Sequence, residues 1–484
     1  MFLDQNRAPL LDALIAHHAE GVHPFHVPGH KHGVGARDLL SLFGQTTLSF
    51  DLNAMHDLDD ACNPVGVIDE AQRLAAHLFG ADHAHFLVNG NTQGIHSMML
   101  SAVGPGEQIV LPRNCHRSAI TGLILSGGLP IYVPVEIDAH LGVATGPTVQ
   151  SVRATLEKNP FVCALFVVNP SYYGFATDIE GMVRAAHDHR AAALVDEAHG
   201  THLSFHPDFP ANAMSVGADM SAVSMHKTGG SLTQSAILLS KGERVPHDIL
   251  KESIDLIRST SASYLLMVSL DTARRSLAQD APGQFERVLQ LARFARTEIN
   301  LIEGLYSPGK EICRPDSSVF NYDESKLLIH CASAGFTGFE MERLLRDRFS
   351  IQVELADMNN VLALITIGTR EEDILHLVGS LKTIVLGNNR KHSRPTVPPP
   401  LMPDVISSPR QAFYSPKKFM PLSGSAGQIS GEMLMSYPPG IPIICPGERI
   451  TQDIIDYVRV LKEQGSLLQG TADPLAVNIR VLGA

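Results

Sequence analysis

Short apolar runs alternate with helical patterns between residues 69 and 240. Asp69–Gly80 places its apolar side chains at helical spacing and ends on a glycine, which is typical of a helix stop. Several of the apolar runs have no polar position, as expected for strands that helices cover on both faces. The alternation predicts β-α-β units, and therefore an α/β fold around a mostly parallel, seven-stranded sheet. The predicted strands are His85–Val88, Gln108–Leu111, Ile131–Val135, Cys163–Val168, Ala192–Val195, Ala222–Met225 and Ala236–Leu239.

Polar clusters follow five of these predicted strands. In open α/β sheets, ligands bind at the carboxyl ends of the strands. We therefore expect the clusters to share one cleft. They are Asn89–Gln93, Arg113–Ser118, Asn169–Tyr173, Asp196–His199 and His226–Lys227.

The pattern after Leu250 predicts several further parts. It first becomes helical, and strand-like Leu327–His330, a helix around Gly338–Phe349 and strand-like Val361–Ile367 then predict a smaller α/β part. A stretch rich in Pro, Asn and Ser predicts a surface linker. Later, the run Tyr437–Pro442 predicts a fixed turn that shapes a pocket wall. The predicted parts are an N-terminal segment (1–50), a large domain (51–310), a small α/β domain (311–386), a linker (387–409) and a C-terminal domain (410–484).

Composition narrows the class of protein. The chain has 484 residues, of which 44% are hydrophobic and 18% charged, as is ordinary for a globular protein. A formal net charge of -12 argues against binding to a nucleic-acid backbone. No apolar run is long enough for a transmembrane helix, and no secretory signal is visible at the start. The six cysteines are scattered, which favours free thiols in a reducing cytoplasm.

The chain has 23 histidines, several of them clustered. A metal site is one interpretation of the clusters. However, no H-E-x-x-H motif occurs and the spacings match no zinc module, so we predict no metal. The clustered histidines are His23, His26, His30, His32, His199 and His202.

An acid at one strand end and a Ser-x-His-Lys motif some thirty residues later have the chemistry of a pyridoxal phosphate (PLP) site. Lys227 follows an apolar strand, where desolvation and the neighbouring His226 lower the pKa of an amine and favour a Schiff base with an aldehyde. Asp196 ends another strand, and a buried carboxylate there needs a cationic partner such as a protonated pyridine nitrogen. Ser224 and His226 stand where side chains could hold the phosphate.

Two further segments fit the same cofactor. His116 follows a strand, where its ring could stack on the cofactor; a hydrogen-bonded core histidine is the alternative. Asn91, Thr92 and Gln93 lie in a glycine-containing loop that could cradle a phosphate at a helix start. Ala198 is small enough to let a ring lie against the backbone.

The ordered motifs resemble the PLP-dependent ornithine/lysine/arginine decarboxylase family, of the aspartate-aminotransferase fold (fold type I). They cover most of the chain. The start, which reaches Pro28–Lys31 almost at once, is similar to the shorter type that lacks an extra N-terminal domain. The matching stretches are Phe25–Lys31, Asp57–Asp60, Arg113–Ser118, Asn169–Gly174, Asp196–Gly200, Ser224–Lys227, Ser231–Ser235, Tyr437–Pro442 and Pro446–Glu448.

The resemblance implies a role for each candidate residue. Lys227 would be the Schiff-base lysine, Asp196 the partner of the pyridine nitrogen, and His116 the stacking residue. The protein would be at least a homodimer with shared sites, in which Ser259–Ser261 of one chain reach the phosphate in the other. Two stretches depart from the family pattern, Asn91–Gln93 at the cradle and Gln428–Glu432 on the substrate side. The cofactor-binding residues would be Asn91, Thr92, Gln93, His116, Asp196, Ala198, His199, Ser224, His226, Lys227, Thr260 and Ser261.

The function that the resemblance implies is decarboxylation of a basic L-amino acid. Similarity to the shorter type favours arginine, then lysine, then ornithine. A cationic substrate side chain would need acidic partners, and Glu354 and Glu448 are candidates, although both could be surface acids. Other PLP reactions (transamination, aldol cleavage, oxidation) and a non-catalytic PLP-binding protein remain alternatives, because the cofactor carries the chemistry. A metal hydrolase is a more distant one.

Overall fold

The computed structural model describes residues 3–387, 400, 402–436 and 440–483. The chain forms two compact units. Unit 1 comprises Met1–Ser101, Leu194–Pro207 and Ala211–Gln284, and unit 2 comprises Ala102–Ala193, Asp208–Pro210 and Phe285–Ala484. The predicted division into five parts is not tested by this and stays a prediction. Residues 388–399 and 401, most of the predicted linker, lie outside the described residues.

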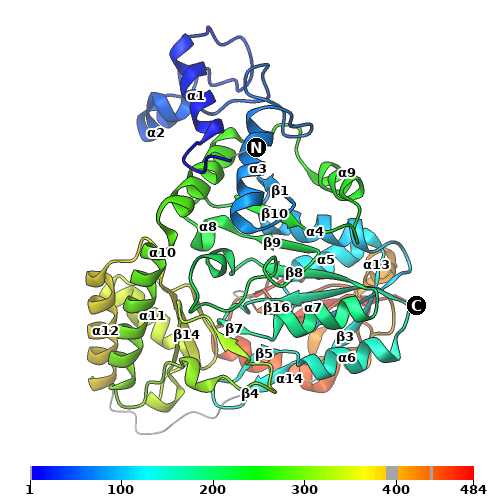
Figure 1. Ribbon diagram of the computed structural model, residues 1–484. Helices are drawn as coiled ribbons and strands as arrows, with labels where there is room; N and C mark the ends of the chain where they lie inside the picture. The colour runs from blue at the N-terminus through cyan, green and yellow to red at the C-terminus, as the bar shows by residue number, and fades with distance from the viewer. Residues whose placement is uncertain (1–2, 388–399, 401, 437–439, 484) are drawn as a thin grey trace. The chain divides into compact units, whose positions relative to one another are not determined.

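Seven strands are hydrogen-bonded in the order β1-β10-β9-β8-β6-β2-β3, which confirms the predicted α/β class (Figure 1). The pairs β2–β3, β2–β6 and β8–β9 are parallel, whereas β10 runs antiparallel to β1 and β9. The bounds differ from those predicted by a few residues. One strand ends at Val223, before the predicted Met225, because the chain turns into helix α8 there. The strands are β1 (His83–Leu87), β2 (Gln108–Pro112), β3 (Leu129–Val133), β6 (Val162–Val168), β8 (Ala192–Glu197), β9 (Met220–Val223) and β10 (Ala236–Ser240).

Helix α3 shows how the sequence pattern of unit 1 becomes structure. Its apolar stripe, which includes Ala71 and Leu74, is buried, and Gly80 ends the helix with φ 70°, a left-handed conformation that glycine adopts without steric cost. Gln72 on the buried face accepts a hydrogen bond from the Phe86 amide and so joins α3 to β1. The helices of unit 1 are α1 (Pro9–Glu20), α2 (Arg37–Ser49), α3 (Val67–Phe79), α4 (Gly90–Ala102), α8 (Met225–Thr228), α9 (His247–Ile257) and the first part of α10 (Tyr264–Asn300).

Unit 2 contains smaller sheets besides its share of the large one. The strand order β12-β14-β13 confirms the strand-like pattern predicted there. The predicted helix is confirmed as α11, which begins at a capping box of Thr337 and Glu340. The helices are α5 (Arg117–Ser126), α6 (Val149–Lys158), α7 (Ile179–Asp188), α11 (Gly338–Phe349), α12 (Glu371–Leu386), α13 (Pro409–Tyr414) and α14 (Gln452–Glu463). The smaller strands are β4 (Glu136–Asp138), β5 (Val143–Gly146), β7 (Phe175–Ala176), β11 (Asn321–Tyr322), β12 (Lys326–His330), β13 (Leu355–Ala356), β14 (Asn360–Leu364), β15 (Lys417–Pro421), β16 (Leu434–Ser436), β17 (Pro442–Ile444), β18 (Leu468–Gln469) and β19 (Asn478–Leu482).

Two predictions from composition can be compared with the structure. All six cysteines are free thiols, as predicted. Among the helices in the described ranges, none is long and apolar enough to cross a bilayer.

Candidate active site

Lys227 lies in α8, a single helical turn that follows β9 directly. The turn is short because Gly229 and Gly230 follow it, the second with φ 86°. The Nζ atom of Lys227 lies 2.7 Å from Nε2 of His199, which is a buried side chain after β8. An imidazole at this distance can exchange a proton with the amine, so the pair can supply an unprotonated lysine.

Asp196 lies near the carboxyl end of β8 and is 4% exposed. Its Oδ1 accepts hydrogen bonds from Asn91 Nδ2 and from the Ala198 amide, both at 3.0 Å. Burial raises the pKa of Asp196, and the Ala198 amide, the charge of Lys227 and Asn91 oppose that rise. A cationic ring nitrogen would stabilise this carboxylate, so Asp196 fits the role predicted for it.

The first turn of α4 carries the predicted phosphate cradle. Gly90, with φ 70°, starts the helix, and the first-turn backbone amides have no partner within the helix, so this end attracts an anion. Thr92 is exposed. Gln93 is 1% exposed, and neither atom of its side-chain amide has a hydrogen-bond partner among the described residues. A buried amide without a partner is costly, which indicates that a ligand completes the site.

Hydrogen bonds hold the Ser224–Thr228 segment in one conformation. The Ser224 carbonyl accepts from Thr201 Oγ1 at 3.0 Å, and Thr228 Oγ1 lies 3.2 Å from Nδ1 of His202. His226 Nδ1 lies 2.9 Å from the Ser235 carbonyl, so this nitrogen is the donor. These contacts bring the predicted residues Ser224, His226 and Lys227 onto one fixed turn in unit 1.

The predicted partner-reaching residues Ser259–Ser261 lie between α9 and α10 and are exposed. The Ser261 amide donates to Ser259 Oγ at 3.2 Å, which shapes the turn. Their exposure leaves them accessible to a second copy of the chain.

His116 belongs to unit 2, where it is the N-cap of α5. The Ser118 amide donates to His116 Nδ1 at 3.2 Å, and Ser118 Oγ lies 2.8 Å from the same nitrogen. Because Nδ1 accepts from the amide, a neutral ring carries its proton on Nε2. The local geometry thus fixes the ring; its predicted stacking on the cofactor stays a prediction.

The two acids that were predicted to contact the substrate side chain differ strongly in their exposure and in their partners. Glu354 is exposed and accepts a hydrogen bond from the Tyr172 hydroxyl. Glu448 is 1% exposed and pairs with Arg113, whose Nε and Nη2 donate to its two oxygens at 3.2 and 2.9 Å. Glu448 is therefore not a surface acid, and Arg113 already occupies both oxygens. Substrate contacts of both residues stay predictions.

Some features were not visible in the sequence. Arg113 and Glu448 are more than three hundred residues apart, so no local pattern indicated their pairing. Among the described residues, one group close enough to hold a metal ion consists of His17, Glu20 and Asp57, which lie outside the predicted histidine clusters.

A family model shows where the chain belongs. Residues 8–373 match the major domain of Orn/Lys/Arg decarboxylase, and residues 402–474 match the C-terminal domain of the same family. The chain belongs to this family. Membership confirms the predicted family and makes the protein a decarboxylase that uses PLP.

Individual relatives agree with the family assignment. The chain is 43% identical to an arginine decarboxylase of Bacillus anthracis, over 99% of this chain and 98% of the relative. It is 40% identical to an arginine decarboxylase of Bacillus subtilis, over 99% of both. The crystal structure of the Francisella novicida lysine decarboxylase superposes with a TM-score of 0.86 at 20% identity, covering 98% of this chain and 81% of that one. This last likeness confirms the fold.

The described residues of unit 1 fit the cofactor. Asp196 could hold the ring nitrogen, because its carboxylate is buried among neutral donors. Gln93 and the start of α4 could hold the phosphate, because the buried side-chain amide of Gln93 has no hydrogen-bond partner among the described residues. Lys227 would supply the amine for the covalent link. The individual assignments stay predictions that mutation can test.

Proposed function

We propose that this enzyme converts L-arginine into agmatine and CO₂. The observation that carries the choice of arginine is the identity of 40–43% with arginine decarboxylases over nearly the whole chain. PLP, when bound, accepts the electrons that the departing carboxylate leaves on Cα. A proton then replaces the carboxylate, so the reaction consumes one proton.

The residues of unit 1 have separate tasks in this proposal. Asp196 keeps a negative charge beside the cofactor ring nitrogen and so keeps that nitrogen protonated. His199 shares a proton with Lys227, which provides an amine for the covalent link and a donor for the proton that returns to the product. The turn Ser224–Thr228 holds Lys227 in place.

The test is release of CO₂ from carboxyl-labelled L-arginine, L-lysine and L-ornithine by the purified, PLP-loaded enzyme. Arginine should give the highest kcat/KM, and agmatine should form in equal amount to CO₂. A preference for lysine or ornithine would overturn the choice of substrate. Oxo acid or hydrogen peroxide without CO₂ would indicate transamination or oxidation instead.

We further propose a homodimer with shared sites. The exposed Ser259–Ser261 turn supports it, because a second chain can reach these residues. The test mixes an inactive Lys227→Ala chain with an inactive chain altered at Thr260 and Ser261. Shared sites would place both lesions in one site of each heterodimer and leave the other intact, so activity should partly return. No recovery after proven subunit exchange would overturn the proposal.

The cytoplasm is the proposed location. Six free thiols support a reducing compartment. Cell fractionation with an antibody against the chain would test this, and recovery outside the cytoplasm would contradict it.

A further inference from the structure

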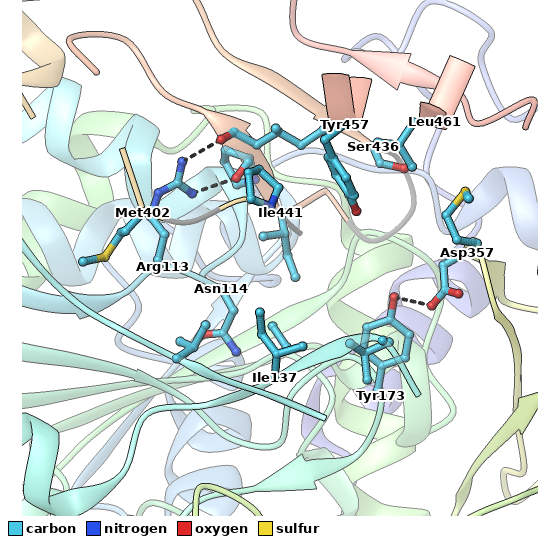
Figure 2. A pocket seen from close by; sticks show the side chains of 18 of the residues that line it. Arg113, Asn114, Ile137, Tyr173, Asp357, Met402, Ser436, Ile441, Tyr457 and Leu461 are labelled. Atoms are coloured by element: carbon cyan, nitrogen blue, oxygen red, sulfur yellow. Dashed lines mark hydrogen bonds between the residues drawn. The ribbon is translucent and has the colours of Figure 1, made fainter. Parts of the chain in front are cut away.

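Unit 2 contains a cavity of about 490 Å³ (Figure 2). Its described walls are mainly apolar, and few polar side chains project into it. The predicted Pro-Gly turn contributes Ile441 and Pro442 to the wall, whereas Tyr437–Pro439 lie outside the described residues. The apolar side chains of the wall include Ile137 and Val143.

Asp357 places a carboxylate at the cavity wall. Its Oδ2 accepts from the Tyr173 hydroxyl at 2.9 Å, and its Oδ1 accepts from the backbone amides of Asn359 and Asn360 at 2.7 and 2.8 Å. Within the described part of the chain, Asp357 forms no salt bridge with a Lys, Arg or His, and burial raises its pKa. A carboxylate that faces an apolar cavity with neutral donors alone is stabilised further by a cation.

A second polar group faces the same cavity without a partner. Asn114 is 7% exposed, and its Oδ1 has no hydrogen-bond partner among the described residues. Figure 2 shows Asn114 on one side of the cavity and the Asp357–Tyr173 pair on another, with Ile137 between them and the Tyr457 hydroxyl pointing into the space. Tyrosine rings near a carboxylate also attract an organic cation through their π faces.

These features describe a ligand with a cationic group, an aliphatic middle and a second hydrogen-bond donor. We infer that this cavity, here called the amine cavity, binds the aliphatic amine that the decarboxylase produces. One cationic end lies at Asp357 and Tyr173, the chain lies along Ile137 and Val143, and the other end donates to Asn114 Oδ1. The identification of the amine as agmatine rests on the proposed function.

The amine cavity discriminates against the amino acid from which the amine is made. A substrate carboxylate would require a free cation, and Arg113 is the cationic side chain of the described lining. Its guanidinium is already engaged with Glu448 and with the carbonyls of Pro442 and Ile443, at 2.7 and 3.3 Å. A carboxylate entering here would meet Asp357 instead, so the amine cavity takes the product class rather than the substrate class.

Amine binding has a consequence for the reaction. Asn114 lies two residues before His116 on the loop that precedes α5. A ligand held by Asn114 therefore restrains the segment that orients His116. The amine lowers turnover through this contact, and added arginine does not relieve the inhibition.

The experiment is calorimetric titration of the PLP-loaded enzyme with agmatine, and with guanidinobutanoate, in which a carboxylate replaces the aminomethyl group. Asp357→Asn should weaken agmatine binding by about 10-fold or more, the loss expected for one charge-assisted contact. Ile137→Trp, which fills the cavity and removes no polar group, should weaken it as well. Asp453→Asn removes one charge in the first turn of α14, outside the cavity, and should leave binding unchanged. Guanidinobutanoate should bind more weakly than agmatine to the wild type.

Two results would overturn the inference. One is wild-type agmatine affinity in both Asp357→Asn and Ile137→Trp. The other is inhibition by agmatine that arginine fully relieves in the wild type. If Asp357→Asn does not fold, Ile137→Trp decides alone. Release of CO₂ from arginine is measured separately. If the enzyme releases CO₂ from arginine but the cavity binds no agmatine, this inference alone fails. If the cavity binds agmatine but arginine releases no CO₂, the proposed function alone fails.

Discussion

Asp196 in unit 1 and Glu448 in unit 2 are both buried carboxylates, but the chain surrounds them differently. Glu448 receives two hydrogen bonds from Arg113 and one from the Cys445 amide at 2.6 Å. Asp196 receives hydrogen bonds from the neutral donors Asn91 and Ala198. A buried acid with a permanent cation is structural, whereas a buried acid with neutral donors retains charge for a ligand.

The same difference determines which groups oppose the rise in pKa that burial causes in each carboxyl. Burial raises the pKa of each carboxyl, and the charge of Arg113 opposes this for Glu448. For Asp196, the Ala198 amide and then the charge of Lys227 oppose it. Lys227 is thus an electrostatic neighbour of Asp196. Asp357 resembles Asp196 rather than Glu448, and this is why the amine cavity attracts a cation.

The largest expected effect on activity comes from substitution of Lys227, the residue near Asp196 that is predicted to bind the cofactor covalently. Lys227→Ala should abolish both turnover and the visible absorption band of the covalently bound cofactor, because no other amine is predicted to form that link. Lys227→Arg keeps the charge beside Asp196 but should be equally inactive, which separates charge from covalent chemistry. Full activity in either variant would show that the assignment is wrong. Absorption spectra and CO₂ release measure the two effects.

Breaking the buried Arg113–Glu448 ion pair should affect the stability of the fold rather than the rate of the reaction. Glu448→Gln leaves the buried guanidinium of Arg113 without its anion and should lower the free energy of unfolding by about 3–5 kcal/mol. Urea denaturation measures this loss. The double variant Arg113→Met/Glu448→Leu should recover much of it, because no unpaired charge remains buried. A Glu448→Gln protein as stable as the wild type would remove the contrast between the two acids.

Asp196→Asn should show the opposite profile. The amide keeps the shape but not the charge, so kcat/KM should fall by ~10²-fold or more, which is about 3 kcal/mol of transition-state stabilisation. The free energy of unfolding without cofactor should not fall, because a neutral amide is easier to bury than a carboxylate. Near-wild-type turnover would mean that another group keeps the ring nitrogen protonated. Loss of stability without loss of turnover would place Asp196 in the same class as Glu448.

Local patterns predicted much of this contrast, but not all of it. Asp196 lies near the end of apolar strand β8 and Lys227 lies shortly after apolar strand β9, and these positions at strand ends depend on short segments of sequence. The strands could be predicted because fully buried strands have uninterrupted apolar runs. The Arg113–Glu448 pair and the Asn114–Asp357 cavity could not, since each joins segments far apart in the chain. Glu448 and Glu354 look alike as sequence letters, and tertiary contacts alone make one a buried ion-pair partner and leave the other exposed.

The smallest expected effect is on the pH dependence of stability and concerns a buried histidine. It extends the comparison from buried acids to a buried base. His85 in β1 is 9% exposed, and its Nε2 has no hydrogen-bond partner among the described residues. Burial, followed by the charges of His247 and Arg258, lowers the pKa of His85 from 6.5 to about 3.

Above about pH 6.5 both the folded and the unfolded chain carry a neutral imidazole at His85, so its contribution to stability is constant. As the pH falls below that value, the unfolded chain binds a proton that the folded chain refuses until about pH 3. The free energy of unfolding should therefore fall by about 1–2 kcal/mol between pH 6.5 and about pH 5. In His85→Phe this part of the pH dependence should disappear, whereas His77→Gln, which removes an exposed histidine from α3, should retain it. Urea denaturation at a series of pH values gives the slope, and an unchanged slope in His85→Phe would mean that this imidazole binds its proton equally in the folded and the unfolded chain.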